Sequence, residues 1–262
     1  MSGGLGFIGT NLAIELKNRN KVFTILDKLN GCDVCEVVIT YPDCTTFVHL
    51  AAFTNVRDSI KWPISAVTEN SVGIVKCLHY AKRLGSHFIF TSSMGAPSSL
   101  SPYTASKLAG EAFCTAYRES YGLDTTVLRL SNVYGPFSKH KESVVAKFIK
   151  LCLDSKPIEI FGNGMQTRDF VHVDDVVRTI IRCSKAKMLN VSSGKATTIL
   201  DLAEMIRSLS AELTGFTPEI VWRNAIKGEI GEVKPKTNIR PKISLEEGLR
   251  STFKWYMEHY AD

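Results

Sequence analysis

The chain has 262 residues, of which 44% are hydrophobic and 22% are charged, as in an ordinary soluble globular protein. The net charge of +6 comes from lysines and arginines scattered along the sequence, which does not favour a nucleic-acid partner. No apolar run approaches membrane-spanning length and no signal peptide is visible. These features predict a cytoplasmic protein with neither a nucleic-acid nor a membrane partner.

Seven cysteines are spread through predicted core segments, for example at Cys77 and Cys114. An odd number in such positions favours reduced thiols over a disulfide framework, which also indicates the cytoplasm. Cys32 and Cys35 form one C-x-x-C pair, but no second pair or nearby histidines complete a zinc site. We therefore predict no bound metal.

The chain opens with a glycine-rich segment, MSGGLGFIGTNL, followed by apolar positions that predict a helix up to Lys17. Glycines at Gly3, Gly6 and Gly9 have the spacing of a loop whose backbone approaches a pyrophosphate at a helix N-terminus. Such a loop belongs between a strand and a helix, yet no strand precedes it here. The missing first strand leaves three explanations open: lost upstream residues, omitted segments, or a natural variant.

Strand-like and helix-like segments then alternate. Residues 22–26 are predicted as a strand ending at Asp27, and residues 46–50 and 88–91 are short apolar runs suited to buried parallel strands. Residues 66–81 repeat apolar positions at helical spacing, and a helix at 104–121 precedes the strand-like TTVLRL. This order predicts an α/β fold with a Rossmann-like, doubly wound parallel sheet.

The second half of the chain has a different rhythm. Amphipathic helices are predicted at 143–153 and 198–209, and short strands at 157–161 and 169–173. Ser244 followed by Glu247 forms a capping box that opens a final helix. We predict a first domain of residues 1–131, to which 166–190 return, and a smaller, interleaved C-terminal lobe of residues 132–165 and 191–262 that binds the substrate.

Two features point to cofactor chemistry. Asp27 follows Gly9 by 18 residues, where a carboxylate accepts hydrogen bonds from ribose hydroxyls and favours NAD over NADP, although a turn aspartate is equally consistent. Tyr103 and Lys107 lie four residues apart, on one helical face. A nearby ammonium lowers the pKa of a phenol, so this pair predicts an acid/base unit beside the strand that ends in FTSS. The alternative is that both are surface residues without a catalytic role.

At this point the sequence resembles a known family along nearly its whole length. The matching segments are SGGLGFIG, VHLAA, ENSVGIVKCL, FTSS, YTASK, RLSNVYGP, TRDFVHVDDV and LEEGLRSTFKWY. In this order they resemble the extended short-chain dehydrogenase/reductase family, specifically its NAD-dependent nucleotide-sugar epimerases and dehydratases.

The resemblance implies a role for individual residues. It implies catalytic roles for Ser93, Tyr103 and Lys107, and substrate contacts for Thr54, Ser93, Asn132 and Arg168. It implies that NAD is held by Gly3, Gly6, Phe7, Ile8, Gly9, Asp27, Lys28, Asp33, Val34, Leu50, Ala51, Ala52 and Asn70, together with Tyr103 and Lys107. His49 and His172 lie within matching segments but are interpreted as packing and turn residues. The helices at 66–84 and 104–121 correspond to those that pair in the family's homodimers.

The expected reaction is epimerisation of a nucleotide-diphosphate sugar at C4, through a 4-keto intermediate. A 4,6-dehydratase needs further acid/base groups, but the segment from Met94 to Pro102 carries no carboxylate. The alternatives are a 4,6-dehydratase, decarboxylase or reductase of the same family, or an inactive dinucleotide-binding scaffold. One departure affects the substrate site: Ile226 stands where the family has a second arginine, and Arg223 or Lys227 is a candidate substitute.

Overall fold

The computed structural model describes residues 1–36, 43–183, 186–225 and 231–260, which form two compact units. The first unit comprises Met1–Ser131 and Val177–Val191, and the second comprises Asn132–Val176 and Ser192–Asp262. The returning segment was predicted to begin at residue 166, but in the structure it begins at Val177. The difference arises because residues 167–172 form two short strands whose pairing partners lie within the second unit.

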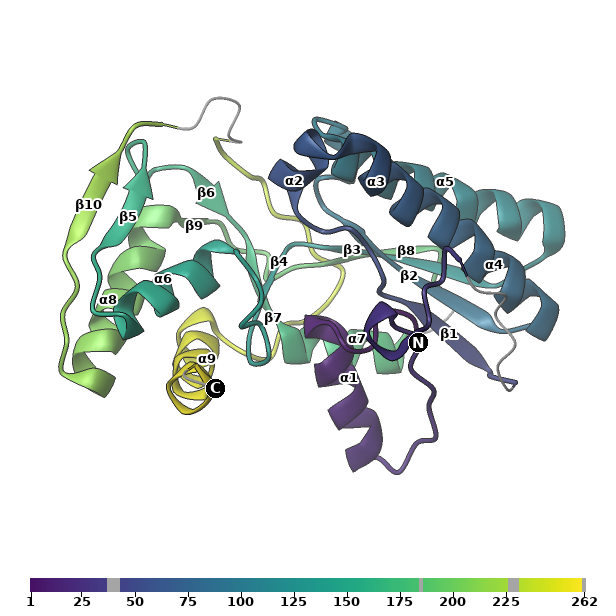
Figure 1. Ribbon diagram of the computed structural model, residues 1–262, viewed down its shortest axis with the longest axis horizontal. Coiled ribbons are helices and arrows are strands. Elements are labelled where there is room, and N and C mark those ends of the chain that lie inside the picture. Colours follow the sequence, from purple (N-terminus) through teal and green to yellow (C-terminus); the bar gives the residue numbers. More distant parts are fainter. Residues whose placement is uncertain (37–42, 184–185, 226–230, 261–262) are drawn as a thin grey trace. The chain divides into compact units, whose positions relative to one another are not determined.

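The first unit is a parallel sheet with helices on both faces, as predicted (Figure 1). Helices α3, α4 and α5 cover one face, and α1 lies on the other with α7 (Figure 1). The elements are α1 (Phe7–Asn18), η1 (Lys28–Asn30), β1 (Thr46–His49), α2 (Val56–Lys61), α3 (Pro63–Val67), η2 (Thr68–Val72), α4 (Gly73–Leu84), β2 (His87–Ser93), η3 (Ala96–Ser98), α5 (Pro102–Tyr121), β3 (Thr125–Leu130), α7 (Val173–Arg182) and β8 (Met188–Val191).

The central sheet has the strand order β1-β2-β3-β8, and every neighbouring pair is parallel. Strands β1, β2 and β3 are short and most of their residues are buried, as expected of parallel strands covered by helices. Phe88, Phe90 and Val127 pack with Ile74 and Leu78 of α4 in one apolar cluster. This arrangement places the C-terminal ends of β1, β2 and β3 at one edge, where ligands meet open α/β sheets.

The first residues of the chain form parallel β-bridges with two different segments. Ser2 bridges Leu26 on one side and His49 on the other, both in parallel. Its backbone N–H donates to the Val48 carbonyl at 3.0 Å, and the Gly3 N–H donates to the Leu26 carbonyl at 2.8 Å. Residues 1–3 thus lie where a first strand would end.

The predicted strand at 22–26 is wrong for most of its length, since only Leu26 makes a β-bridge. Val22 is fully exposed, whereas Leu26 is buried. A strand needs a neighbour for its backbone groups, and the pairing observed between this segment and residues 1–3 reaches Thr24, whose carbonyl accepts from the Met1 ammonium. The β-propensity of these residues therefore finds no ladder at their N-terminal end.

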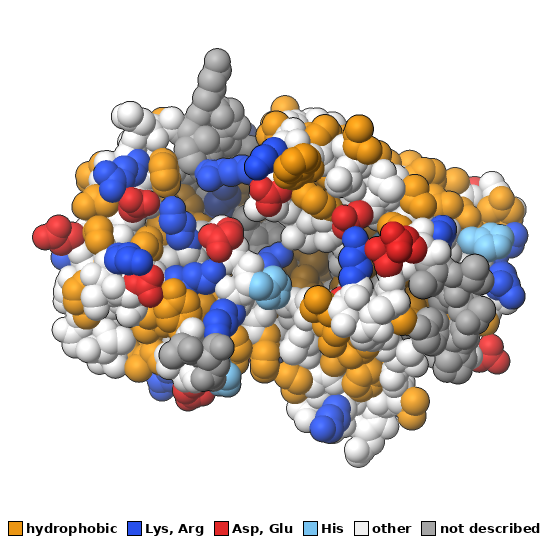
Figure 2. Space-filling model, in the orientation of Figure 1, with side chains coloured by type: hydrophobic (Ala, Val, Ile, Leu, Met, Phe, Trp, Pro, Cys, Tyr) orange, Lys and Arg blue, Asp and Glu red, His pale blue; other side chains and the backbone are white. Residues whose placement is uncertain are grey.

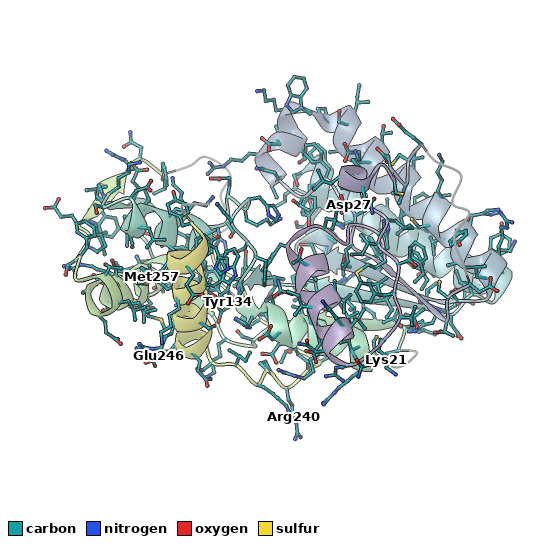
Figure 3. The ribbon with its side chains drawn as sticks, turned by 60° about the horizontal axis from the view of Figure 1, so that its bottom comes forward. Lys21, Asp27, Tyr134, Arg240, Glu246 and Met257 are labelled. Atoms are coloured by element: carbon teal, nitrogen blue, oxygen red, sulfur yellow. The ribbon has the colours of Figure 1, made fainter. Side chains whose placement is uncertain are left out.

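The second unit packs three helices against short strands. The elements are β4 (Asn132–Tyr134), α6 (Val144–Leu153), β5 (Ile158–Phe161), β6 (Thr167–Arg168), β7 (Phe170–His172), β9 (Thr197–Thr198), α8 (Ile199–Thr214), β10 (Ile220–Arg223) and α9 (Leu245–His259). Helix α9 begins with the predicted capping box, in which the Ser244 hydroxyl accepts from the Glu247 N–H. Tyr134 lies against this helix (Figure 3), where a side chain at Gly248 would collide with the tyrosine ring.

Candidate active site

The glycine loop has the shape of an anion cradle. Gly3 has a φ of +67°, and a Cβ there would lie 2.5 Å from the backbone nitrogen of Ala51. A Cβ at Gly9 would lie 2.6 Å from the Cα of Gly4. Gly6 is the N-cap of α1 and has no side chain to satisfy the amides of the first turn. The loop therefore fits a pyrophosphate, whose charge is stabilised by these N–H groups and the helix dipole.

Asp27 lies beside the start of α1, whereas Lys21 lies beyond the other end of that helix (Figure 3). The Asp27 carboxylate accepts from the Leu5 N–H at 3.0 Å and from the Leu29 N–H at 3.1 Å. The same side chain thus orders the glycine loop and caps η1. Asp27 thus caps a turn, as one of the two interpretations made from the sequence had it, and its contact with a ribose stays a prediction.

A small charged cluster follows Asp27. The Lys28 ammonium lies 3.3 Å from the Asp33 carboxylate and 3.2 Å from that of Glu69. Asp33 also accepts from the Cys35 N–H at 2.8 Å, and its pKa is lowered because this hydrogen bond and Lys28 outweigh the cost of burial. Val34, which was expected to hold NAD together with Asp33, is buried in the first unit's core.

Asn70 links the loop after β1 to α5. Its side chain exchanges two hydrogen bonds with the backbone of Phe53, at 2.8 and 3.2 Å. Its amide also donates to the Ser106 hydroxyl at 2.8 Å, and that hydroxyl donates to the Tyr103 carbonyl at 2.8 Å. Asn70 therefore fixes the loop of residues 50–54, which contains the predicted cofactor and substrate positions Leu50, Ala51, Ala52 and Thr54.

Ser93, Tyr103 and Lys107 are brought together at the C-terminal end of β2 and the start of α5. Ser93 is the last residue of β2, and its hydroxyl lies near enough to the Tyr103 phenol to lower the pKa of that phenol. The Lys107 ammonium lies 5.9 Å from the centroid of the Tyr103 ring and donates to the Thr91 carbonyl at 2.9 Å. Lys107 is only 4% exposed. The fold thus assembles three residues that the sequence separates by up to fourteen positions.

The pKa of Tyr103 corrects one expectation. Burial raises the pKa of this phenol to about 12, and the Ser93 hydrogen bond opposes the shift only in part. The sequence had suggested that Lys107 lowers it. In the structure the Lys107 ammonium donates to the Thr91 carbonyl and lies 5.0 Å from the centroid of the Phe90 ring, and burial of the phenol is the larger influence on its pKa.

His49 confirms its interpretation as a packing residue. It is 2% exposed, stacks on Phe88 and Phe90, and its Nδ1 shares a hydrogen bond of 2.7 Å with the Ser2 hydroxyl. Burial, with a further contribution from the Lys107 charge, lowers its pKa to about 3. His49 is therefore neutral at physiological pH.

Sequence reasoning missed a polar cluster directly behind the site. The Glu111 carboxylate accepts from the Ser92 hydroxyl at 2.6 Å and forms a two-pronged ion pair with Arg129 at 2.9 and 2.6 Å. Glu111 lies one helical turn after Lys107, and Ser92 precedes Ser93. The signal was present, because an arginine inside the apolar strand TTVLRL requires a buried partner.

The remaining predicted substrate residues belong to the second unit. The Asn132 side chain donates to the Asp169 carbonyl at 3.0 Å, and Arg168 Nη1 donates to the Thr167 carbonyl at 2.7 Å. The Asp169 carboxylate, 4% exposed, accepts from the backbone N–H groups of residues 193–195, which fixes that loop beside Arg168. Arg223 is paired with Glu159 at 2.8 Å, while Ile226 and Lys227 lie outside the described residues.

Two further properties concern only the described part of the chain. Its histidine, cysteine and acidic side chains form no group of three or more that could hold a metal ion. Among its helices, none combines the length and the apolar character needed to cross a bilayer.

Comparison with known proteins identifies the family. The model of the NAD dependent epimerase/dehydratase family matches residues 1–192. The chain belongs to this family. Among its curated members, UDP-glucuronate 4-epimerase of Thermodesulfobacterium geofontis is 32% identical over 93% of this chain and 81% of its own length. Other relatives are named as a UDP-glucuronic acid decarboxylase and a dTDP-D-glucose 4,6-dehydratase.

Solved structures of the family extend the comparison. The UDP-glucose 4-epimerase of Thermotoga maritima, solved with UDP-glucose, has a TM-score of 0.87 and 28% identity over 99% of this chain and 98% of its own. The Thermus thermophilus UDP-glucose 4-epimerase, solved with NAD, has a TM-score of 0.83 and 27% identity over 98% of both chains. The fold is the Rossmann fold of these epimerases, and NAD is the cofactor of this family member.

Proposed function

We propose that the protein is an NAD-dependent 4-epimerase of a nucleotide-diphosphate sugar. The observation that carries the proposal is the meeting of Ser93, Tyr103 and Lys107 at the C-terminal edge of the sheet, next to a glycine cradle that fits a pyrophosphate. Gly3, Gly9, the start of α1 and Asp27 would hold NAD, which supplies reversible hydride acceptance.

The chain's own groups handle the proton. For Tyr103 to act as the base, its phenol must first release its own proton to solvent. The phenolate oxygen then takes the proton of the sugar 4-hydroxyl and returns it when the 4-keto group is reduced. The Ser93 hydroxyl, which interacts with the Tyr103 phenol, holds the reacting oxygen and passes the proton. Lys107 supplies a buried positive charge 5.9 Å from the tyrosine ring, which favours the phenolate once the proton leaves.

The positions and partners of the carboxylates next to Tyr103 in sequence favour epimerisation over dehydration. A dehydratase needs an acid and a base beside the tyrosine, yet residues 94–102 contain neither aspartate nor glutamate. The nearest acidic residue after Tyr103 in sequence is Glu111. Both its oxygens are held by Arg129 and Ser92, so it is not available to move protons on a sugar.

We propose that Asn132, Arg168 and Thr54 contact the substrate. Arg168 is the strongest of these assignments, because a guanidinium binds two phosphate oxygens in one plane. Asp169 supports it by fixing the neighbouring loop of residues 193–195. UDP-sugars are the first substrates to test, because the relatives described above act on or were solved with such sugars.

Turnover tests this proposal directly. The protein is incubated with NAD and a panel of UDP-, GDP- and dTDP-sugars, and the products are separated. We expect a C4 epimer that is lost in Tyr103→Phe. Tyr121→Phe is the matched control, because this phenol lies at the exposed end of the same helix. A 4-keto-6-deoxy product, detected by its absorbance in alkali, would establish a dehydratase instead, and no turnover of any sugar would favour the scaffold.

A further inference from the structure

The start of α5 carries Tyr103, and its backbone donors are all accounted for. Pro102 has no N–H, the Thr104 N–H donates to the Ser101 hydroxyl at 3.2 Å, and the Ala105 N–H donates to the Ser101 carbonyl at 2.9 Å. The Tyr103 N–H donates at 3.2 Å to the hydroxyl of Ser59, which is 44 residues away in sequence. The first turn of this helix is thus capped from two different elements.

Ser59 is placed to hold that contact. It belongs to α2, is fully buried, and its hydroxyl donates to the Val56 carbonyl at 2.6 Å while accepting from Tyr103. A hydroxyl that donates on one side has its lone pairs directed to the other, so its orientation is fixed. Helix α2 begins directly after the loop of residues 50–54, and the Asn55 side chain caps it.

The backbone N–H and carbonyl of Tyr103 are therefore both hydrogen-bonded to serine hydroxyls. The N–H is held by Ser59, and the carbonyl accepts from Ser106, which Asn70 holds in turn. We propose that Ser59 is a positioning residue for Tyr103: it fixes the first turn of α5, and so the direction in which the phenol meets Ser93. This inference rests on the proposed role of Tyr103 in proton transfer.

Loss of the Ser59 hydroxyl has two consequences. In Ser59→Ala the Tyr103 N–H loses its acceptor in a buried position, so the first turn of α5 opens more often and its amide exchanges faster. The phenol is then misplaced for part of the time, and misplacement of a reacting group by about 1 Å costs roughly 100-fold in rate. We expect kcat to fall by between about 10- and 100-fold, with KM unchanged because Ser59 lies behind the helix start.

The experiment compares three variants. Ser59→Ala removes the acceptor, Ser59→Thr restores a hydroxyl, and Ser210→Ala is the matched control. Ser210 is also fully buried, and its hydroxyl donates to the Phe216 carbonyl at 2.8 Å within the second unit. The readouts are the hydrogen-exchange rate of the Tyr103 amide in the full chain, and kcat and KM on the sugar that the wild-type protein turns over.

The proposal requires faster Tyr103 exchange and lower kcat in Ser59→Ala, recovery of both in Ser59→Thr, and neither change in Ser210→Ala. Unchanged exchange in Ser59→Ala, or an equal loss of kcat in Ser210→Ala, overturns it. If the wild-type protein turns over no sugar, the proposed function fails, and the exchange of the Tyr103 amide still decides whether Ser59 holds this residue. If Ser59→Ala does not fold, Ser59→Thr decides. A wild-type kcat in Ser59→Thr together with an altered exchange rate of the Tyr103 amide overturns the proposal. A wild-type kcat together with an unaltered exchange rate supports it.

Discussion

The ion pair between Glu111 and Arg129 offers a quantitative test of how the strands behind the site are held. Removing one member of a buried pair costs about 3–5 kcal/mol, because the other charge is left without its partner. The Glu111 side chain is 6% exposed and that of Arg129 is 23% exposed. We therefore expect Arg129→Met to cost near the upper value, since it strands the less accessible charge, and Glu111→Leu to cost about 3 kcal/mol.

Replacing both residues together should be far less harmful. The double variant leaves no buried charge, and only the Ser92 hydroxyl loses its acceptor, at a cost of about 1–3 kcal/mol. The coupling free energy between the two substitutions should therefore be at least about 3 kcal/mol. The pKa of Arg129, raised by its hydrogen bonds to Glu111, is consistent with a strongly coupled pair.

Urea unfolding of the wild-type protein, the two single variants and the double variant measures these free energies. Arg250→Met is the matched control, because the Arg250–Glu212 pair is 36% and 55% exposed and its loss should leave the free energy of unfolding nearly unchanged. Strict additivity of the two single costs would refute the reasoning. So would a larger cost for Glu111→Leu than for Arg129→Met.

Three further predictions concern pH and assembly. His49, whose pKa is lowered to about 3, stays neutral in the folded protein while the unfolded chain takes up a proton below about pH 6.5, so stability is lost as the pH falls. From about pH 7 to about pH 5 this loss should be about 2 kcal/mol in unfolding experiments and should be absent from His49→Gln; an equal loss in that variant would contradict the assignment. The Tyr103 phenol, with a pKa near 12, should contribute no phenolate absorbance below about pH 10 when wild type is compared with Tyr103→Phe, and a transition below about pH 9 would be inconsistent with its burial. We also predict a homodimer through the helices at 66–84 and 104–121, over which apolar side chains gather (Figure 2); Leu108→Glu should give a monomeric mass in light scattering, and a monomeric wild-type protein would rule it out.

Much of the fold could be predicted because local patterns and packing agree. TTVLRL is strand β3 at residues 125–130, and the capping box at Ser244 opens α9 as expected. The strand at 22–26 could not be excluded from sequence, because a strand forms only where another segment pairs with its backbone, and apolar patterning does not reveal that pairing. The helix predicted at 66–81 is interrupted by a π-helical turn that no spacing pattern indicated.

The site was predictable to the extent that its residues carry reactive groups. Tyr103 and Lys107 attract notice by their chemistry and spacing, and Asp27 by its place 18 residues after Gly9. Ser59 carries no such signal, since a serine in a short helix is common and its partner is a backbone N–H far away in sequence. The direction of the Tyr103 pKa shift also needed the structure, because it depends on how deeply the phenol is buried.

The π-helical turn at Thr68–Val72 joins α3 to α4 within one continuous helix and carries Asn70 at its centre. Such a turn holds one residue more than a regular turn, and it is frequent at functional sites. Insertion or deletion of a single codon can therefore create or remove it while the flanking helices keep their buried faces. A single insertion or deletion could therefore convert this turn into regular helix and move Asn70 away from its partners. The hydrogen bonds that join the loop of residues 50–54 to α5 would then be lost, while the rest of the helix stayed in place.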